Sequence, residues 1–220
     1  MSHEGLKGNG KLEYLQSTAL SDDITFFPDS LNSNAKSFIN KTQKDPVEFP
    51  DLNAETVAVH WDPPNDAMFI YDKDKPMLMY QGKAEMHGRI ELNPEGMKGM
   101  GQIEIVKKAH LVSNSMRFQQ TAFDADTAEF KLESDVISEF AFATDNVNAH
   151  IDFVSKKGIF KSNIGGSLVE FDPNQYICYV NEFTWDMEGG EVAMSSDNVE
   201  TLVEAGYQPE SAYFECSLLP

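Results

Sequence analysis

The chain of 220 residues is poor in cysteine and in long apolar runs, and each shortage removes a class of protein. Its two cysteines, Cys178 and Cys216, are too few for a disulfide framework or a zinc finger. Cys178 lies in an apolar run, YICYV, which is typical of a small buried side chain, although a Cys178–Cys216 bridge stays open. No apolar run reaches membrane-spanning length, and the first ten residues are too polar for a signal peptide.

Arginine is also scarce, and basic charge as a whole is outnumbered. Only Arg89 and Arg117 are arginines, and 17 basic residues face 36 acidic ones, which gives a formal net charge of −19. Such a chain repels polyanions, so we expect no nucleic-acid partner and no charge-driven binding to anionic lipid surfaces. The acidity is explained by solubility, or alternatively by an affinity for cations such as Ca²⁺.

The composition is apolar enough to form a buried core, and apolar and polar residues alternate as they do in β-strands. Hydrophobic residues make up 41% and aromatic residues 11%, which is too apolar for a disordered segment. Apolar and polar residues alternate in Thr56–Trp61 and Asn146–Phe153, as in half-buried strands. Turn residues recur about every ten positions, a spacing typical of an all-β sandwich, jellyroll, barrel or β-solenoid. The polar stretch Asn32–Asn53 is predicted to be the longest loop, exposed and mobile.

One short helix is predicted near the C-terminus. Asp197 can cap it, Glu200 follows three residues later, and Gly206 can end it. Helices do not alternate with the predicted strands, so a parallel α/β fold is not expected.

The chain contains an internal echo at an offset of about 91 residues. Gly5–Phe38 matches Gly96–Phe130 through a shared G-x-K-G-x-G pattern and through Glu, Leu and Phe positions behind it. We therefore predict two tandem similar β units, 1–95 and 96–190, followed by a partial extra element, 191–220, that carries the short helix.

Because the chain opens directly inside the first copy, we expect it to be a part of a longer protein. Cutting a repeat array leaves unpaired strand edges, here at Gly10–Gln16 and near Ser211–Cys216. We predict that the fragment either self-associates through such an end or folds its last strand back on the second unit.

The glycine pattern resembles a phosphate-binding loop only superficially. Such a loop needs a following helix, whose N-terminus meets the anion, and here a strand follows. Glycine is instead expected to supply a positive φ and a close backbone approach where the strand enters the sheet.

The weak metal candidates are two His-x-Asp pairs, His60 with Asp62 and His150 with Asp152. Each pair would place an imidazole and a carboxylate on the same polar face of a strand. One His and one Asp are too few ligands for a site, so we expect no metal and no cofactor. The acidic pairs at Asp22, Asp72 and Asp124 lack the glycine turn of a Ca²⁺ loop and indicate solvated turns.

The aromatic run Tyr176, Tyr179, Phe183 and Trp185 suggests either core packing or an exposed platform for sugar rings. No G-x-S-x-G, no H-E-x-x-H and no cysteine with a plausible histidine partner occurs, so no catalytic residue is predicted. A pair of glycosidase-like carboxylates stays open because sequence cannot nominate one.

Several segments carry a family likeness: GMKGMG, AFDADTAEF, DVISEFAFATDNVNAHIDF and NQYICYVNEFTWDM. They resemble segments of large, repeat-rich envelope proteins of Bacteroidetes-type bacteria, over most of 5–190. Their strand-and-turn rhythm is similar to OstA-like β-jellyrolls of the lipopolysaccharide-transport type. That resemblance implies an open or solenoidal β structure with an apolar groove for lipid and without catalytic residues.

We therefore expect an all-β, jellyroll- or solenoid-like fold and a non-catalytic role, structural or ligand-binding, within a larger bacterial cell-envelope protein in the periplasm or on the outer surface. Lipid or lipopolysaccharide handling is one such role, and the partner would be a lipid, a glycan or another envelope protein. The alternative is a carbohydrate-active enzyme or a carbohydrate-binding module on a β-helix or sandwich scaffold.

Overall fold

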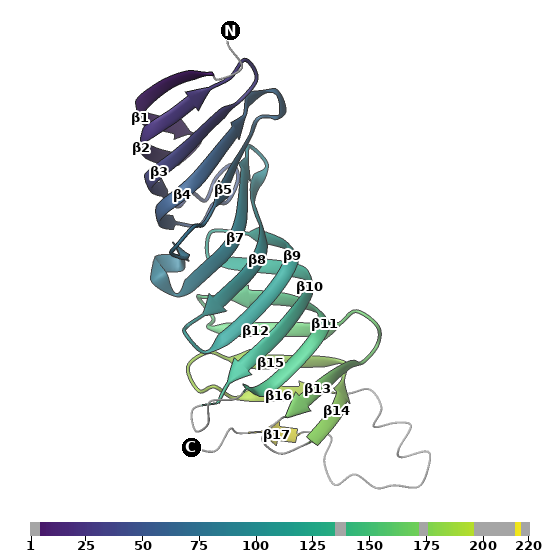
Figure 1. Ribbon diagram of the computed structural model, residues 1–220. Helices are drawn as coiled ribbons and strands as arrows, with labels where there is room; N and C mark the ends of the chain where they lie inside the picture. The colour runs from purple at the N-terminus through teal and green to yellow at the C-terminus, as the bar shows by residue number, and fades with distance from the viewer. Residues whose placement is uncertain (1–4, 135–139, 172–175, 196–213, 217–220) are drawn as a thin grey trace, which may run out of the picture. The chain divides into compact units, whose positions relative to one another are not determined.

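The computed structural model describes residues 5–134, 140–171, 176–195 and 214–216. Within these ranges the chain is almost entirely β-strand, which confirms the all-β prediction (Figure 1). The helical segments there are two short 3-10 turns, η1 (Pro63–Asn65) and η2 (Tyr80–Gly82). Neither is long enough to cross a membrane, and the rest of the described chain offers no other candidate. The helix predicted over 197–206 lies outside the described residues.

The chain divides into two compact units. Unit 1 comprises Met1–Lys107 and Asn114–Thr121, and unit 2 comprises Lys108–Ser113 and Ala122–Pro220. The boundary therefore runs through β9 (Ala109–Phe118), which contributes residues to both units. This division rests on compactness, whereas the predicted division into 1–95, 96–190 and 191–220 rests on sequence similarity and stays a prediction.

Unit 1 is built on an antiparallel sheet in which most strands pair with the next along the chain (Figure 1). The sheet is stable locally because apolar and polar residues alternate along each strand, so one face is buried and the other is exposed. Its strands are β1 (Leu6–Tyr14), β2 (Ser17–Phe26), β3 (Leu31–Asn40), β4 (Leu52–Asp62), β5 (Ala67–Tyr71), β6 (Met77–Met79), β7 (Ala84–Asn93) and β8 (Gly96–Ile105).

Strands β5 and β6 act together as one interrupted strand. Both pair with β4 on one side and with β7 on the other, and the chain between them leaves the sheet. In unit 2, β12 and β13 pair with different parts of β11 in the same way. The strands of unit 2 after β9 are β10 (Ala122–Glu133), β11 (Phe140–Asp152), β12 (Lys157–Ser162), β13 (Ser167–Phe171), β14 (Tyr176–Val180), β15 (Glu182–Asp186), β16 (Val192–Ser195) and β17 (Phe214–Cys216).

The two cores differ in chemistry. Unit 1 buries mainly aliphatic side chains and methionines, including Met77, Met79 and Met86, each fully inaccessible. Unit 2 buries an aromatic cluster in which Phe160 and Phe183 stack with ring centroids 4.4 Å apart. Because the buried faces are filled in this way, the stability of each unit comes from packing of the strands' inward faces.

The stretch Asn32–Asn53 is not the exposed, mobile loop that its polarity suggested. Its first part is β3, in which Leu31, Ala35 and Phe38 point inward and Asn32, Asn34 and Lys36 point to solvent. The remaining connection is anchored by Phe49, only 2% exposed, whose backbone pairs in both directions with Gln43 at 2.9 Å. The prediction failed because outward polar residues hid the period-2 pattern of a strand.

Glycine has the structural role that was predicted for it. Gly10 and Gly101, at matching places in the echo, have φ values of +144° and +140°. Gly101 lies directly opposite Gly88, and a Cβ on Gly101 would fall 2.1 Å from the carbonyl oxygen of His87. Strands β7 and β8 can therefore approach only because neither residue has a side chain.

The last described strand pairs within the chain. β17 forms an antiparallel ladder with β16, with Met194 opposite Phe214. Because β16 (Val192–Ser195) belongs to the predicted extra element, 191–220, the predicted return of the last strand onto the second unit, 96–190, stays a prediction, as does self-association through an edge.

Candidate functional site

The two aspartates of the His-x-Asp pairs accept hydrogen bonds from the turns that follow their strands. Asp62, at the end of β4, accepts hydrogen bonds from the backbone and side-chain nitrogens of Asn65, the latter at 2.7 Å. Asp152, at the end of β11, accepts from the backbone N–H of Val154 at 2.8 Å. Burial opposes ionisation of Asp152, but the bonds from Val154 and Ser155 outweigh it and lower the pKa of Asp152. Both residues therefore have a structural explanation.

The two histidines pair across strands rather than with those carboxylates. His60 Nδ1 lies 2.6 Å from Asn32 Oδ1 on β3, and His150 Nδ1 lies 2.7 Å from Asp124 Oδ1 on β10. Since an amide oxygen only accepts, Nδ1 is the donor of His60. His60 lies in unit 1 and His150 in unit 2.

Two further histidines, which the sequence did not single out, also bond to a side chain that is distant in the sequence. His87 Nδ1 lies 2.8 Å from Asp72 Oδ2, and His110 Nε2 lies 2.7 Å from Glu133 Oε1. Across the described ranges no group of three or more His, Cys, Asp or Glu side chains could hold a metal ion. Only the strand register could have revealed these pairs, because their members are 15 and 23 residues apart.

The aromatic run divides between core and surface. Phe183 and Trp185 are buried, which confirms the prediction that one face of the run is core. Tyr179, on β14, is 62% exposed, so it alone among these three could meet a sugar ring. The side chain of Tyr176 lies outside the described part, as does that of Cys216, so the Cys178–Cys216 bridge stays untested.

The outer face of unit 1 carries a row of side chains that crosses seven paired strands. Strand register places each member directly opposite the next, so all of them share the solvent side of the sheet. We call this row the cross-strand ladder; it consists of Lys7, Thr25, Asn32, His60, Phe69, Glu91 and Lys98.

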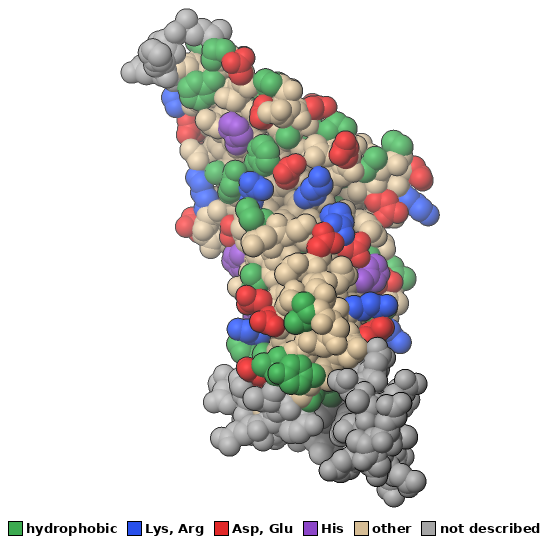
Figure 2. All heavy atoms as spheres, turned by 90° about the vertical axis from the view of Figure 1, so that its right-hand side faces the viewer, with side chains coloured by type: hydrophobic (Ala, Val, Ile, Leu, Met, Phe, Trp, Pro, Cys, Tyr) green, Lys and Arg blue, Asp and Glu red, His purple; other side chains and the backbone are tan. Residues whose placement is uncertain are grey.

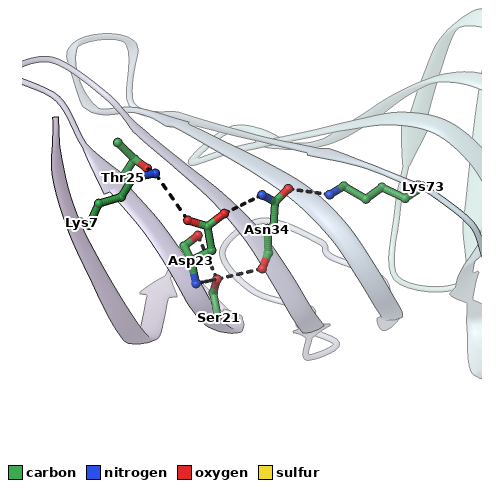
Figure 3. A network of polar contacts seen from close by, with 6 residues as sticks. All are labelled: Lys7, Ser21, Asp23, Thr25, Asn34 and Lys73. Carbon is green, nitrogen blue, oxygen red and sulfur yellow. Dashed lines mark hydrogen bonds and ion pairs between the residues drawn. The ribbon is translucent and has the colours of Figure 1, made fainter. Parts of the chain in front are cut away.

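A polar network fixes one end of this face (Figure 3). Lys7 Nζ donates to Thr25 Oγ1 at 2.7 Å and lies 3.6 Å from Asp23. Asn34 bridges the strands, because its amide nitrogen donates to Asp23 at 2.8 Å and its oxygen accepts from Lys73. The bond from Asn34 and the charge of Lys7 lower the pKa of Asp23. The surface polar groups are thus held by neighbours on adjacent strands.

Aromatic and cationic groups occupy the other end. The rings of His60 and Phe69 stack with centroids 6.1 Å apart and an angle of 29° between their planes. The guanidinium carbon of Arg89 lies 5.5 Å from the centroid of Phe69, a cation–π distance. Tyr71, 38% exposed, is directly opposite Arg89 in the sheet.

Several hollows on this unit could hold a ligand. One, about 540 Å³, is lined by exposed apolar Ile39 and Leu78 together with the Glu55–Lys75 ion pair. A second, about 380 Å³, is bordered by Asn32, Asn34, His60 and Tyr71 among others. A third, about 100 Å³, is bordered by Arg89, Lys98 and Met100 among others. On the face drawn in Figure 2, acidic, basic and apolar side chains are interspersed.

Together these features define an all-β protein with closed hydrophobic cores and an ordered polar and aromatic outer face. No known family model matches the sequence, and no solved structure matches the fold.

Proposed function

We propose that this chain is a non-catalytic structural and ligand-binding segment of a larger bacterial cell-envelope protein. Support comes from the way each unit joins a filled core to an outer sheet face of mutually bonded side chains. Such a sheet is a rigid scaffold, and its surface hollows are places where a ligand can bind. The envelope setting rests on the resemblance of the sequence to large envelope proteins.

The non-catalytic part of the proposal rests on one observation. The aspartate and histidine side chains that could act in catalysis are hydrogen-bonded to turns or to neighbouring strands. Asp62 and Asp152 hold turns, and His60 and His150 bond to residues on the preceding strand. A general base must in addition reach a proton of the substrate, and a nucleophile must reach a substrate atom. In the described structure these hydrogen bonds stabilise the sheet and its turns, which supports a scaffold role more than an enzymatic one.

Lipid handling, the role implied by OstA-like domains, is supported by the hollow beside β6. Ile39 and Leu78 are 45% and 40% exposed there, and the Glu55–Lys75 pair, at 2.6 Å, lies at its edge. An apolar floor with a charged rim suits an acyl chain that carries a polar head group. The net charge of −19 favours a neutral or zwitterionic head group over an anionic one.

The carbohydrate-binding alternative is favoured by a different observation, the exposed Tyr71 beside Phe69 and Arg89. Aromatic faces stack on sugar rings, and the amides of Asn32 and Asn34 can bond to hydroxyl groups. The carbohydrate-active enzyme is the further alternative, and it requires two carboxylates placed on opposite sides of a glycosidic bond.

Fractionation of the source cells with an antibody against this chain tests the proposed setting. We expect the parent protein in the envelope fraction, and its recovery in the cytosolic fraction would refute the proposal. The non-catalytic part is tested by incubating the chain with polysaccharides and measuring reducing ends. We expect no release above that of a heat-denatured sample, and release by the folded chain would favour the enzyme.

A further inference from the structure

Arg89 stands out because its charge is not balanced within the sheet. In a chain with 36 acidic residues, no carboxylate among the described residues lies within ion-pair distance of Arg89. Its contact is instead with the face of Phe69, 5.5 Å away. Stacking on a ring leaves the N–H groups at the edge of the guanidinium available, and these groups match a carboxylate bidentately.

Unit 2 provides an internal comparison for this position. There the pairing of β12 with β15 corresponds to that of β5 with β7, and Lys161 is opposite Glu182 as Tyr71 is opposite Arg89. Lys161 and Glu182 form an ion pair at 3.4 Å. The same place in the sheet is therefore neutralised internally in unit 2, while in unit 1 it carries an aromatic ring and a cation without a carboxylate partner.

The surroundings of Arg89 fit a sugar. Tyr71 offers an exposed ring, and Phe69 and His60 continue the aromatic surface across β5 and β4. The hollow of about 380 Å³ beside Tyr71 also contains Asn32. Asn32 uses its amide oxygen for His60, so its amide nitrogen can donate to a hydroxyl group. Hollows of this volume are typical of small-ligand sites.

We propose that the Tyr71–Arg89 face of unit 1 binds a glycan in which a carboxylated sugar is flanked by neutral sugars. Arg89 binds the carboxylate, Tyr71 stacks on a sugar ring, and Asn32 bonds to a hydroxyl group. Lys98 adds a second cation, whereas Glu91, opposite it, opposes a second carboxylate nearby. With the net charge of −19 this excludes glycans of high charge density and favours isolated carboxylates.

The inference deepens the ligand-binding part of the proposed function and rests on it. Its probe is a hyaluronan tetrasaccharide, in which glucuronate alternates with N-acetylglucosamine, and its neutral counterpart is an N-acetylglucosamine tetramer. Isothermal titration should show binding of the acidic probe that is at least tenfold tighter than binding of the neutral one. Equal affinity for the two, or no binding of the acidic probe, would overturn the proposal.

Variants localise the interaction to this face. Arg89→Gln should weaken binding of the acidic probe at least tenfold, and Tyr71→Ala should weaken binding of both probes. Lys161→Gln, the same loss of one positive charge but from the corresponding Lys161–Glu182 pair of unit 2, should leave both affinities unchanged. If Arg89→Gln keeps its circular dichroism spectrum and binds as the parent chain does, the assignment is wrong.

The outcomes separate this inference from the proposed function. Cleavage of the acidic probe would refute the non-catalytic role and leave the binding face intact. Recovery of the parent protein in the envelope, together with no binding by the chain, would refute the binding face alone.

Discussion

At the residue scale, aspartate and asparagine side chains determine where several strands end, and glycine allows two strands to approach each other. Asp62, Asn93, Asp152 and Asp186 each stand at the end of a strand and accept a backbone N–H from the following turn. This local bonding is why Asp and Asn are favoured in turns. It also explains why the two His-x-Asp pairs looked like sites in the sequence, since the second member of each is a turn residue.

The glycine pair of β7 and β8 gives a prediction with a matched control. Gly10 and Gly101 have nearly the same φ, but a Cβ meets nothing within 4 Å at Gly10 and a carbonyl oxygen at 2.1 Å at Gly101. Gly10→Ala should therefore cost about 1–3 kcal/mol for backbone strain alone. Gly101→Ala should cost about 1–3 kcal/mol more, because the strands must separate. Urea unfolding of both variants measures the difference, and equal losses would show that crowding is unimportant.

Asp186 gives a prediction about acid. Its Oδ1 accepts backbone N–H groups of Gly189 at 2.8 Å and Glu188 at 2.9 Å, and these bonds lower the pKa of Asp186 below its ordinary value of 3.8. A carboxylate with a lowered pKa stabilises the fold above its unfolded pKa and loses that effect as the pH falls through its folded pKa. Wild type should therefore melt above Asp186→Asn at pH 7, and the gap should close towards pH 2. A gap that persists at pH 2 would assign the effect to packing.

At the element scale, the sequence predicts strand existence well and register poorly. The alternating run Thr56–Trp61 lies within β4, and Asn146–Phe153 lies within β11 except for its last residue, as expected. β3 is not predicted from the sequence because Asn32, Asn34 and Lys36 dominate its composition and two of its inward positions are the weakly apolar Ser33 and Ala35. The partners of the histidines could not be predicted, because a cross-strand contact depends on register, and register is set by the turns and the core of the whole sheet.

The connection between β3 and β4 is an anchored element, and Phe49 is its anchor. Phe49→Ala should lower the free energy of unfolding by about 3 kcal/mol, since burial is lost and a cavity is left. It should also release the exposed Lys41 and Lys44 to trypsin, which cleaves after lysine in extended chain. Phe26→Ala, at a position 42% exposed, is the control and should change neither property much. Rapid tryptic cleavage at Lys44 in the parent chain would contradict the anchored state.

At the scale of the whole molecule, the main question is whether the two units unfold together. Strand β9 gives its first residues, 109–113, to unit 2 and the rest, 114–118, to unit 1. If one unit unfolds, the part of β9 that remains ordered must end in the middle of a strand, which interrupts its regular pairing. We therefore expect the shared strand to make the two units unfold together, even though each has a core of its own.

The two tryptophans allow this coupling to be measured, because Trp61 lies in unit 1 and Trp185 in unit 2. Trp185→Phe leaves fluorescence that reports unit 1, and Trp61→Phe leaves fluorescence that reports unit 2. Since Phe retains most of the buried area, neither change should unfold its unit. We expect the two variants to show the same urea midpoint by fluorescence as by far-UV circular dichroism, because coincident transitions are the mark of a single cooperative unit. A fluorescence midpoint that differs between the variants, while the circular dichroism midpoints agree, would show that the shared strand breaks and that each unit unfolds independently.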